Sequence, residues 1–200
     1  MSQSALILVD CENDFLSEQG IMHAAVKDSL AANNVIPNLN RVLDAAHANG
    51  IPVIFTSISF QTGHPEIGDN AYGILAAVKD ANAFVRGSWG ADIYDGLHRS
   101  DNDHVLQKST MCAFKQTGLK ALLEQQGITQ LIFGGLVTDL CLETSMRSAY
   151  DEGYEVIGLV DCMASLNLSV HEATVADNFP MFSKPMLHDA FIAQLGQQAA

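Results

Sequence analysis

The sequence predicts a doubly wound α/β fold, in which helices cover both faces of a mostly parallel sheet. Three observations favour this fold. Short apolar runs of strand length alternate with stretches of helical periodicity along most of the 200 residues. The apolar runs are nearly continuous, as expected for strands that are buried on both faces. No repeat, low-complexity tract or linker divides the chain, so we expect one domain over residues 1–200.

The first quarter of the chain contains two predicted strands and one predicted helix. Residues 5–9 form a continuous apolar run, and residues 51–56 form a second one. Between them, apolar residues recur at helical spacing from Val35 to Ala46, and Asn33 or Asn34 can cap that helix. This strand–helix–strand order predicts a parallel pair of strands joined by a helix.

The second half of the chain continues the alternation. In chain order, the predicted elements are a strand at 104–107, a helix at 119–123, a strand at 131–133, a helix at 139–152 and a strand at 154–160. Ser169 and Glu172 have the spacing of a capping box, which predicts the start of a further helix at Ser169.

Residues 61–100 interrupt this regularity. They contain 6 of the 15 glycines, although they make up one fifth of the length. Long segments of this kind are either lids and pocket walls or plain surface excursions, and the sequence leaves both interpretations open.

Charge and composition exclude several classes of function. Ten Lys and Arg against 23 Asp and Glu give a formal net charge of −13, so we expect neither a nucleic-acid partner nor docking on an anionic membrane. The sequence has no basic secretory leader and no apolar run of about 20 residues. We therefore expect a cytoplasmic protein with reduced thiols at its four cysteines, Cys11, Cys112, Cys141 and Cys162.

Three reactive side chains follow predicted strands, where open α/β sheets bind their ligands. They are Asp10, Lys108 and Cys141. Cys141 falls in the first turn of a helix, whichever of Thr138 or Asp139 is its N-cap. The helix N-terminus and a nearby Lys108 would favour a thiolate, and Asp10 could serve as a general base. The alternative is a core cysteine, a turn-capping aspartate and a surface lysine.

Three ordered segments resemble the isochorismatase-like cysteine hydrolases. Residues 6–15 resemble the family's strand, Asp and Gln-Asn-Asp-Phe-type turn, 108–114 resemble its Lys segment, and 134–144 closely match its nucleophile turn. Residues 147–156 and 161–165 also fit, so the resemblance covers nearly the whole chain. It implies a Rossmann-like three-layer fold.

The resemblance also implies a reaction. Asp10 would accept and later donate a proton, Lys108 would stabilise and orient, and Cys141 would be the nucleophile. The expected activity is hydrolysis of an amide, ureido or carbamoyl C–N bond through a thioester, without a cofactor. A cis Leu136–Val137 peptide would help to aim the Val137 and Cys141 N–H groups as an oxyanion hole. Relatives commonly form dimers or tetramers, so a homo-oligomer acting on a small molecule is expected.

The chain departs from the family pattern in two places. Cys11 and Glu12 stand where the family often has an aliphatic residue and a glutamine. Glu12 would raise the pKa of Asp10 if both faced the pocket, a question that the sequence leaves open. The nicotinamidase branch carries an Asp-x-His pair and a further His after the second strand, where this chain has Thr56 to Ser59. No histidine shows ligand spacing, so we expect no metal.

Four aromatic residues flank the motifs and are the predicted substrate-binding residues: Phe15, Phe60, Trp89 and Phe114. Trp89 could equally anchor its loop. Arg86 could meet a substrate carboxylate or form a surface salt bridge. Two other functions stay open: a non-catalytic or redox-responsive binding protein on the same fold, and an isochorismate-type vinyl-ether hydrolase. Isochorismatases proper generally lack the cysteine, so Cys141 favours C–N hydrolysis over the vinyl-ether reaction.

Overall fold

A six-stranded parallel sheet forms the centre of the computed structural model, which describes residues 3–198. The strand order is β3-β2-β1-β4-β5-β6. The strands are β1 Ser4–Val9, β2 Val53–Ile58, β3 His104–Lys108, β4 Gln130–Leu136, β5 Glu155–Ala164 and β6 Lys184–Met186. This order confirms the predicted doubly wound fold, with all the described strand pairs parallel.

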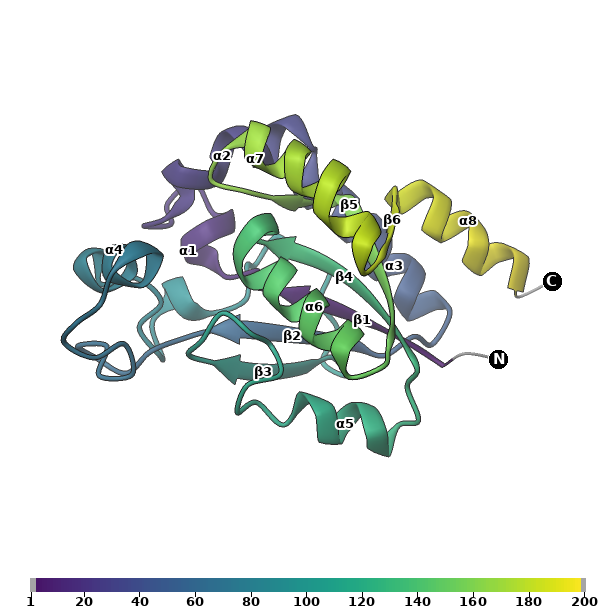
Figure 1. Cartoon of the computed structure of the whole chain (residues 1–200), viewed down its shortest axis with the longest axis horizontal. Helices are drawn as coiled ribbons and strands as arrows, with labels where there is room; N and C mark the ends of the chain where they lie inside the picture. Colours follow the sequence, from purple (N-terminus) through teal and green to yellow (C-terminus); the bar gives the residue numbers. More distant parts are fainter. Residues whose placement is uncertain (1–2, 199–200) are drawn as a thin grey trace.

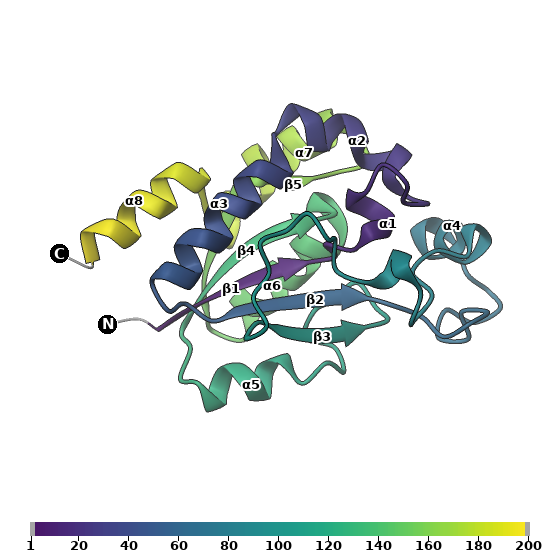
Figure 2. The same cartoon turned by 180° about the vertical axis from the view of Figure 1, so that it is seen from behind.

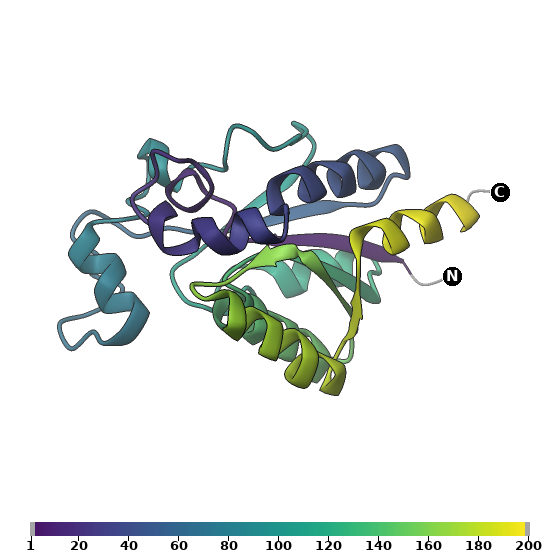
Figure 3. The same ribbon diagram turned by 90° about the horizontal axis from the view of Figure 1, so that it is seen from above.

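Helices cover both faces of this sheet (Figures 1 and 2). One face carries α2 (His23–Ala32), α3 (Val35–Ala48) and α8 (His188–Gln198), and the other carries α5 (Leu119–Gln125) and α6 (Glu143–Asp151). Figure 3 shows the two layers from above, with α3 and α6 on opposite sides. Helix α7 (Leu168–Ala173) packs against α2 and against the turn that follows β4.

The core has two halves because the sheet separates them. Along β1, Leu6 and Leu8 join the half beneath α3, while Ile7 and Val9 join the half beneath α5 and α6. All four side chains are fully buried. Burial on both faces is the physical reason for the continuous apolar run in the sequence.

Two short helices lie near the carboxyl ends of the strands, α1 (Asn13–Leu16) and α4 (Gly73–Ala81). Figures 1 and 2 show α4 beyond the strand tips, at the end of the molecule opposite to both termini. Within residues 3–198, no helix has the length and apolar character needed to cross a bilayer.

Helix starts are where sequence patterns were least accurate. The cap of α7 is Asn167, whose side chain accepts the Ser169 N–H, so the capping box at Ser169 was wrong by two residues. A π-helical turn, Thr138–Leu142, replaces the first turn of the helix expected at 139–152. Asn34 does occupy the N-cap of α3, but it makes no capping side-chain hydrogen bond.

Candidate active site

The three predicted reactive residues meet where the strand order reverses, between β1 and β4. Asp10 directly follows β1, Lys108 ends β3, and Cys141 lies in the π-helical turn after β4. The connections that leave the two strands on either side of such a reversal run to opposite faces of the sheet. They leave a crevice at the carboxyl ends of these strands. The structure therefore brings together all three residues at the place where this fold class binds ligands.

Lys108 and Asp10 form a buried ion pair. The Lys108 Nζ atom lies 2.8 Å from Asp10 Oδ1, donates to Oδ2 at 2.9 Å and donates to the Thr110 carbonyl oxygen at 3.0 Å. The two charged side chains are 0% and 1% exposed. These contacts occupy the ammonium group and fix the direction of the Asp10 carboxylate.

The backbone around Asp10 is tightly constrained. Asp10 has φ 50°, in the left-handed region, and its N–H donates to the Thr56 carbonyl oxygen at 3.1 Å. In β4, Gly135 lies opposite Val9 and has φ 113°, and a Cβ there would lie 2.0 Å from the Val9 carbonyl oxygen. Only glycine allows β1 and β4 to approach so closely at the point where Asp10 leaves the sheet.

Burial keeps Cys141 protonated at rest. The residue is 8% exposed, and desolvation raises the pKa of its thiol far above the ordinary range. Asp10 raises this pKa further, and Lys108 offsets only part of the effect. Burial therefore opposes the predicted lowering of the thiol pKa, because desolvation of the sulfur outweighs the effect of Lys108.

The pKa values of Lys108 and Asp10 are also set by burial and by neighbouring groups. Burial alone would lower the pKa of Lys108, but Asp10, Cys141 and Glu12 outweigh burial and raise it, so Lys108 stays a cation. Burial raises the pKa of Asp10 against the opposing effect of Lys108. A base of raised pKa suits a carboxylate that must take a proton from a thiol.

Glu12 is buried close to Asp10 but does not line the cavity on which Cys141 and Asp10 open. Its side chain is fully buried, and its Oε1 accepts the Ile58 N–H at 2.6 Å. Its Oε2 has no hydrogen-bond partner among the described residues. Burial and then Asp10 raise the pKa of Glu12 well above its usual range. Two carboxyl groups therefore share one buried cation, and Glu12 is the one held protonated.

Cys141 and Asp10 open on a small enclosed cavity of about 20 Å³. Helix α4 contributes Ile74, Leu75 and Val78 to its wall. The remaining lining residues are also apolar: Phe15, Ile58, Phe84, Met111, Val137 and Leu140. The glycine-dotted segment therefore supplies a pocket wall, one of the two interpretations that its sequence allowed.

Only one of the four predicted aromatic residues, Phe15, lines this cavity. Phe60 is buried against His64, with ring centroids 5.2 Å apart. Trp89 is 44% exposed, and Phe114 lies against Tyr154. The structure brings none of these three into the wall beside Cys141, because each packs against other partners or faces solvent.

The turn after β1 ties the glycine-dotted segment to the sheet. The buried Asp14 carboxylate accepts the Phe84 N–H through Oδ2 at 2.7 Å, and Asn13 Nδ2 donates to the Trp89 carbonyl oxygen at 2.9 Å. No such role was predicted for Asn13 and Asp14 from the sequence. Their position inside a motif was the available signal, but their partners lie 70 or more residues away.

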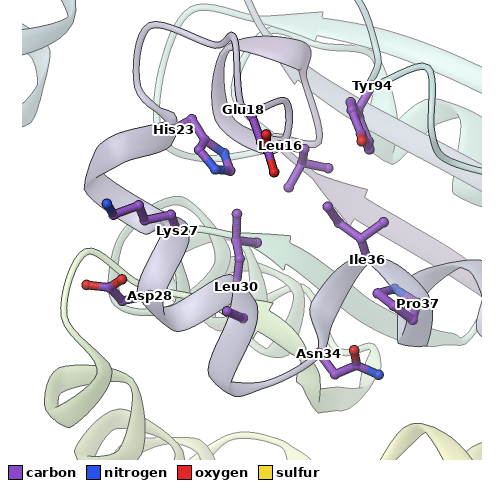
Figure 4. Close-up of a pocket in the computed structure, with 11 residues that line it drawn as sticks. Leu16, Glu18, His23, Lys27, Asp28, Leu30, Asn34, Ile36, Pro37 and Tyr94 are labelled. Atoms are coloured by element: carbon purple, nitrogen blue, oxygen red, sulfur yellow. The ribbon is translucent and has the colours of Figure 1, made fainter.

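A wider groove of about 660 Å³ lies between α2, the start of α3 and Tyr94. Figure 4 shows its mixed lining, with Glu18, Lys27 and Asp28 beside Leu30 and Ile36. This groove is not lined by Asp10, Lys108 or Cys141, so it is not the candidate reaction site. Residues 3–198 also contain no group of three or more His, Cys, Asp or Glu side chains arranged to hold a metal ion.

Comparison with known proteins places this geometry in a family. A family model described as the isochorismatase domain matches residues 4–190. The chain belongs to the isochorismatase family. Among curated members, the ureidoacrylate amidohydrolase RutB of Serratia proteamaculans is 32% identical over 170 residues, covering 80% of this chain and 68% of that protein. The RutB of Rhizobium rhizogenes is 28% identical, covering 99% of this chain and 85% of that protein.

Solved structures of isochorismatase-like proteins share the fold. A cysteine hydrolase from Pseudomonas syringae pv. phaseolicola superposes with a TM-score of 0.85 at 20% identity, covering 98% of this chain and 93% of that one. The N-carbamoylsarcosine amidase from Thermoplasma acidophilum superposes with a TM-score of 0.73 at 21% identity, covering 94% and 98%. At these identities the likeness concerns the fold.

Proposed function

We propose that this protein is a cysteine hydrolase that cleaves the C–N bond of a small amide, ureido or carbamoyl compound through a thioester intermediate. The observation that carries the proposal is the buried Asp10–Lys108 ion pair, whose Asp10 lines one enclosed cavity together with Cys141 at the switch point of the sheet. Family members named as amidohydrolases and as an amidase support the same class of reaction.

The acylation step begins from a neutral thiol. As the Cys141 sulfur attacks the substrate carbonyl carbon, its proton passes to the Asp10 carboxylate, and an S–C bond forms. Lys108 holds the carboxylate through both oxygens, at 2.8 and 2.9 Å, so the base is already oriented before substrate arrives. The protonated Asp10 then gives its proton to the leaving nitrogen, and the C–N bond breaks.

Deacylation reverses the roles of these groups. Asp10, ionised again, accepts a proton from a water molecule, which attacks the thioester carbonyl carbon. The C–S bond then breaks, the protonated Asp10 returns its proton to the Cys141 sulfur, and the acid leaves. A single carboxylate therefore serves as base and acid in turn, which requires a pKa above that of an ordinary aspartate, as burial provides for Asp10.

The negative charge on the carbonyl oxygen needs donors in both steps, and we assign them to the backbone N–H groups of Val137 and Cys141. The peptide bond between Leu136 and Val137, at the start of the turn that carries them, is cis. The turn is held by Leu140 and Leu142, whose N–H groups both donate to the Val137 carbonyl oxygen, at 3.0 and 3.2 Å. Donors of this kind are typically worth about 10²–10³ in rate each.

Ammonia release from a panel of small amides, ureides and carbamates tests the proposal. We expect Cys141→Ala to abolish turnover. Cys112→Ala should leave turnover unchanged, because it removes a half-buried thiol that is hydrogen-bonded to the Ser148 hydroxyl. Mass spectrometry of the rapidly quenched enzyme should find the acyl group on the peptide that contains Cys141. Ammonia release that survives in Cys141→Ala would refute the thioester, because the C–N bond would then be cleaved without the Cys141 sulfur. If the wild type turns over no compound of the panel, this result would favour a binding protein.

We further propose that the active form is a homo-oligomer, as the family resemblance implies. Light scattering on the purified chain measures its mass in solution. A monomeric mass at the concentration of the activity assay would reject this part of the proposal.

A further inference from the structure

The wall around Cys141 has a chemical character that narrows the class of substrate. Apart from Asp10 and Cys141 themselves, every side chain that lines the cavity is apolar. Among residues 3–198, no lysine, arginine or histidine side chain contributes to the lining. An acyl group bonded to Cys141 would therefore contact hydrocarbon and aromatic surface on all sides that the protein provides.

Three cations lie nearest in the chain to this wall, and each is already engaged. Lys79, next to Val78, donates to the Gly68 carbonyl oxygen at 2.7 Å and does not line the cavity. Lys108 is fully buried, and its ammonium group contacts both Asp10 oxygens and the Thr110 carbonyl oxygen. Arg86 directs its guanidinium at the Ser59 carbonyl oxygen at 3.5 Å and at the Glu66 carboxylate at 3.9 Å. Lys108 and Arg86 do not line the cavity either, so none of the three offers a free charge to an anion bound beside Cys141.

A carboxylate on the acyl group would meet Asp10, the charged side chain in the cavity lining, whose counter-ion Lys108 is already paired with it. A substrate carboxylate would lose its water and gain no counter-ion there, and burying an unpaired charge is strongly unfavourable. A methyl or phenyl group in the same place would gain from leaving water.

The half-buried part of the wall has the most room to adjust. A volume of about 20 Å³ holds about one water molecule, so any acyl group must displace side chains. Four lining residues are half-buried: Ile74 and Leu75 on α4, Met111 and Leu140. The acyl group is therefore expected to lie against these side chains, Ile74 and Leu75 among them.

We propose that the acyl group transferred to Cys141 is uncharged and apolar, so that the substrate is a small aliphatic or aromatic amide rather than an amide that carries a carboxylate near the scissile bond. This inference rests on the proposed function.

The test compares matched amides that differ in one terminal group. Butyramide and succinamate have the same chain length, but one ends in a methyl group and the other in a carboxylate. We expect kcat/KM for butyramide to exceed that for succinamate by at least about 100-fold, and benzamide to exceed 4-carboxybenzamide likewise.

A charge placed in the wall should change this preference. We expect Leu75→Arg to lower the butyramide-to-succinamate ratio by at least about tenfold, because the new guanidinium can pair with the carboxylate. The matched control Ala77→Arg adds the same charge on an exposed position of α4 and should leave the ratio unchanged.

The outcomes separate this inference from the proposed function. Wild-type turnover of succinamate equal to or faster than that of butyramide, with an acyl group on Cys141, would overturn the inference and leave the hydrolase intact. An equal change of the ratio in Leu75→Arg and Ala77→Arg would also overturn the role of the wall. Absence of turnover and of any adduct on Cys141 with either member of each pair would overturn both.

Discussion

Glu12 offers the sharpest test of the electrostatics at this site. Glu12→Gln keeps the shape of the side chain and removes the group that could add a second negative charge beside Asp10. The amide oxygen can still accept the Ile58 N–H, which the Glu12 Oε1 accepts at 2.6 Å. The amide nitrogen takes the place of Oε2, which has no partner among the described residues, and this adds a penalty of about 1–3 kcal/mol that does not vary with pH.

The pH-dependent part of the change in the free energy of unfolding has a definite sign. In the unfolded chain Glu12 ionises near the ordinary glutamate pKa of 4.5, whereas burial and Asp10 keep it protonated in the folded protein well above that value. Between these two pKa values the unfolded state releases a proton that the folded state retains. The free energy of unfolding of the wild type therefore loses about 1.4 kcal/mol per pH unit from this group, and Glu12→Gln abolishes the loss.

Urea denaturation of both proteins at closely spaced pH values from about 5 to about 8.5 measures the effect. The stability of Glu12→Gln relative to the wild type should rise by about 1.4 kcal/mol per pH unit and level off at the folded pKa. Glu18→Gln, at an exposed position on the neighbouring turn, should give a flat difference. A flat difference for Glu12→Gln as well would refute the reasoning, because Glu12 would then ionise in the folded protein as it does in water.

Three further predictions concern the same corner of the molecule. Gly135→Ala should destabilise the fold by about 3 kcal/mol or more in urea, because its Cβ would lie 2.0 Å from a carbonyl oxygen of β1, whereas Gly196→Ala, which meets nothing within 4 Å, should not destabilise it. Alkylation of Cys141 by iodoacetamide should be slow at pH ~7 and still accelerating at pH ~9, since burial raises the pKa of its thiol; a plateau near neutral pH would contradict this. Lys108→Met should lower the free energy of unfolding by about 3–5 kcal/mol, because it leaves the Asp10 carboxylate unpaired. Lys108→Met combined with Asp10→Asn should recover much of this loss. Equal stability of the single and double variants would refute the pairing.

The positions of the reactive groups could be predicted because they depend on topology. Asp10 and Lys108 follow apolar runs of strand length, and parallel strands end at one edge of the sheet, so their meeting follows once the strands are identified. The family resemblance added the role of Cys141 and its partners. What these patterns could not supply was the protonation state of Cys141, because desolvation depends on the side chains that close over the sulfur.

The pocket wall was the part least accessible from the sequence. Helix α4 lies in a segment whose glycines suggest an irregular loop, and its apolar residues are too few to define a helical period. The aromatic residues next to the motifs were chosen by proximity along the chain, yet Phe84 lines the cavity and Phe60 does not. Which side chain reaches Cys141 is decided by contacts such as that of Asp14 with the Phe84 N–H, formed between residues 70 positions apart.

The strand order has a consequence for how such an enzyme can diversify. The atoms proposed to react are carried by the tips of β1, β3 and β4, whereas Ile74, Leu75 and Val78 come from the excursion between β2 and β3. Substitutions in that excursion can therefore change which compound fits without moving a single reacting atom. Asn13 and Asp14 hold the excursion to the sheet, so residues of its wall can be substituted while the excursion keeps its place. Chemistry and selectivity thus lie on separately mutable stretches of one chain, which allows one reaction to be kept while its substrates change.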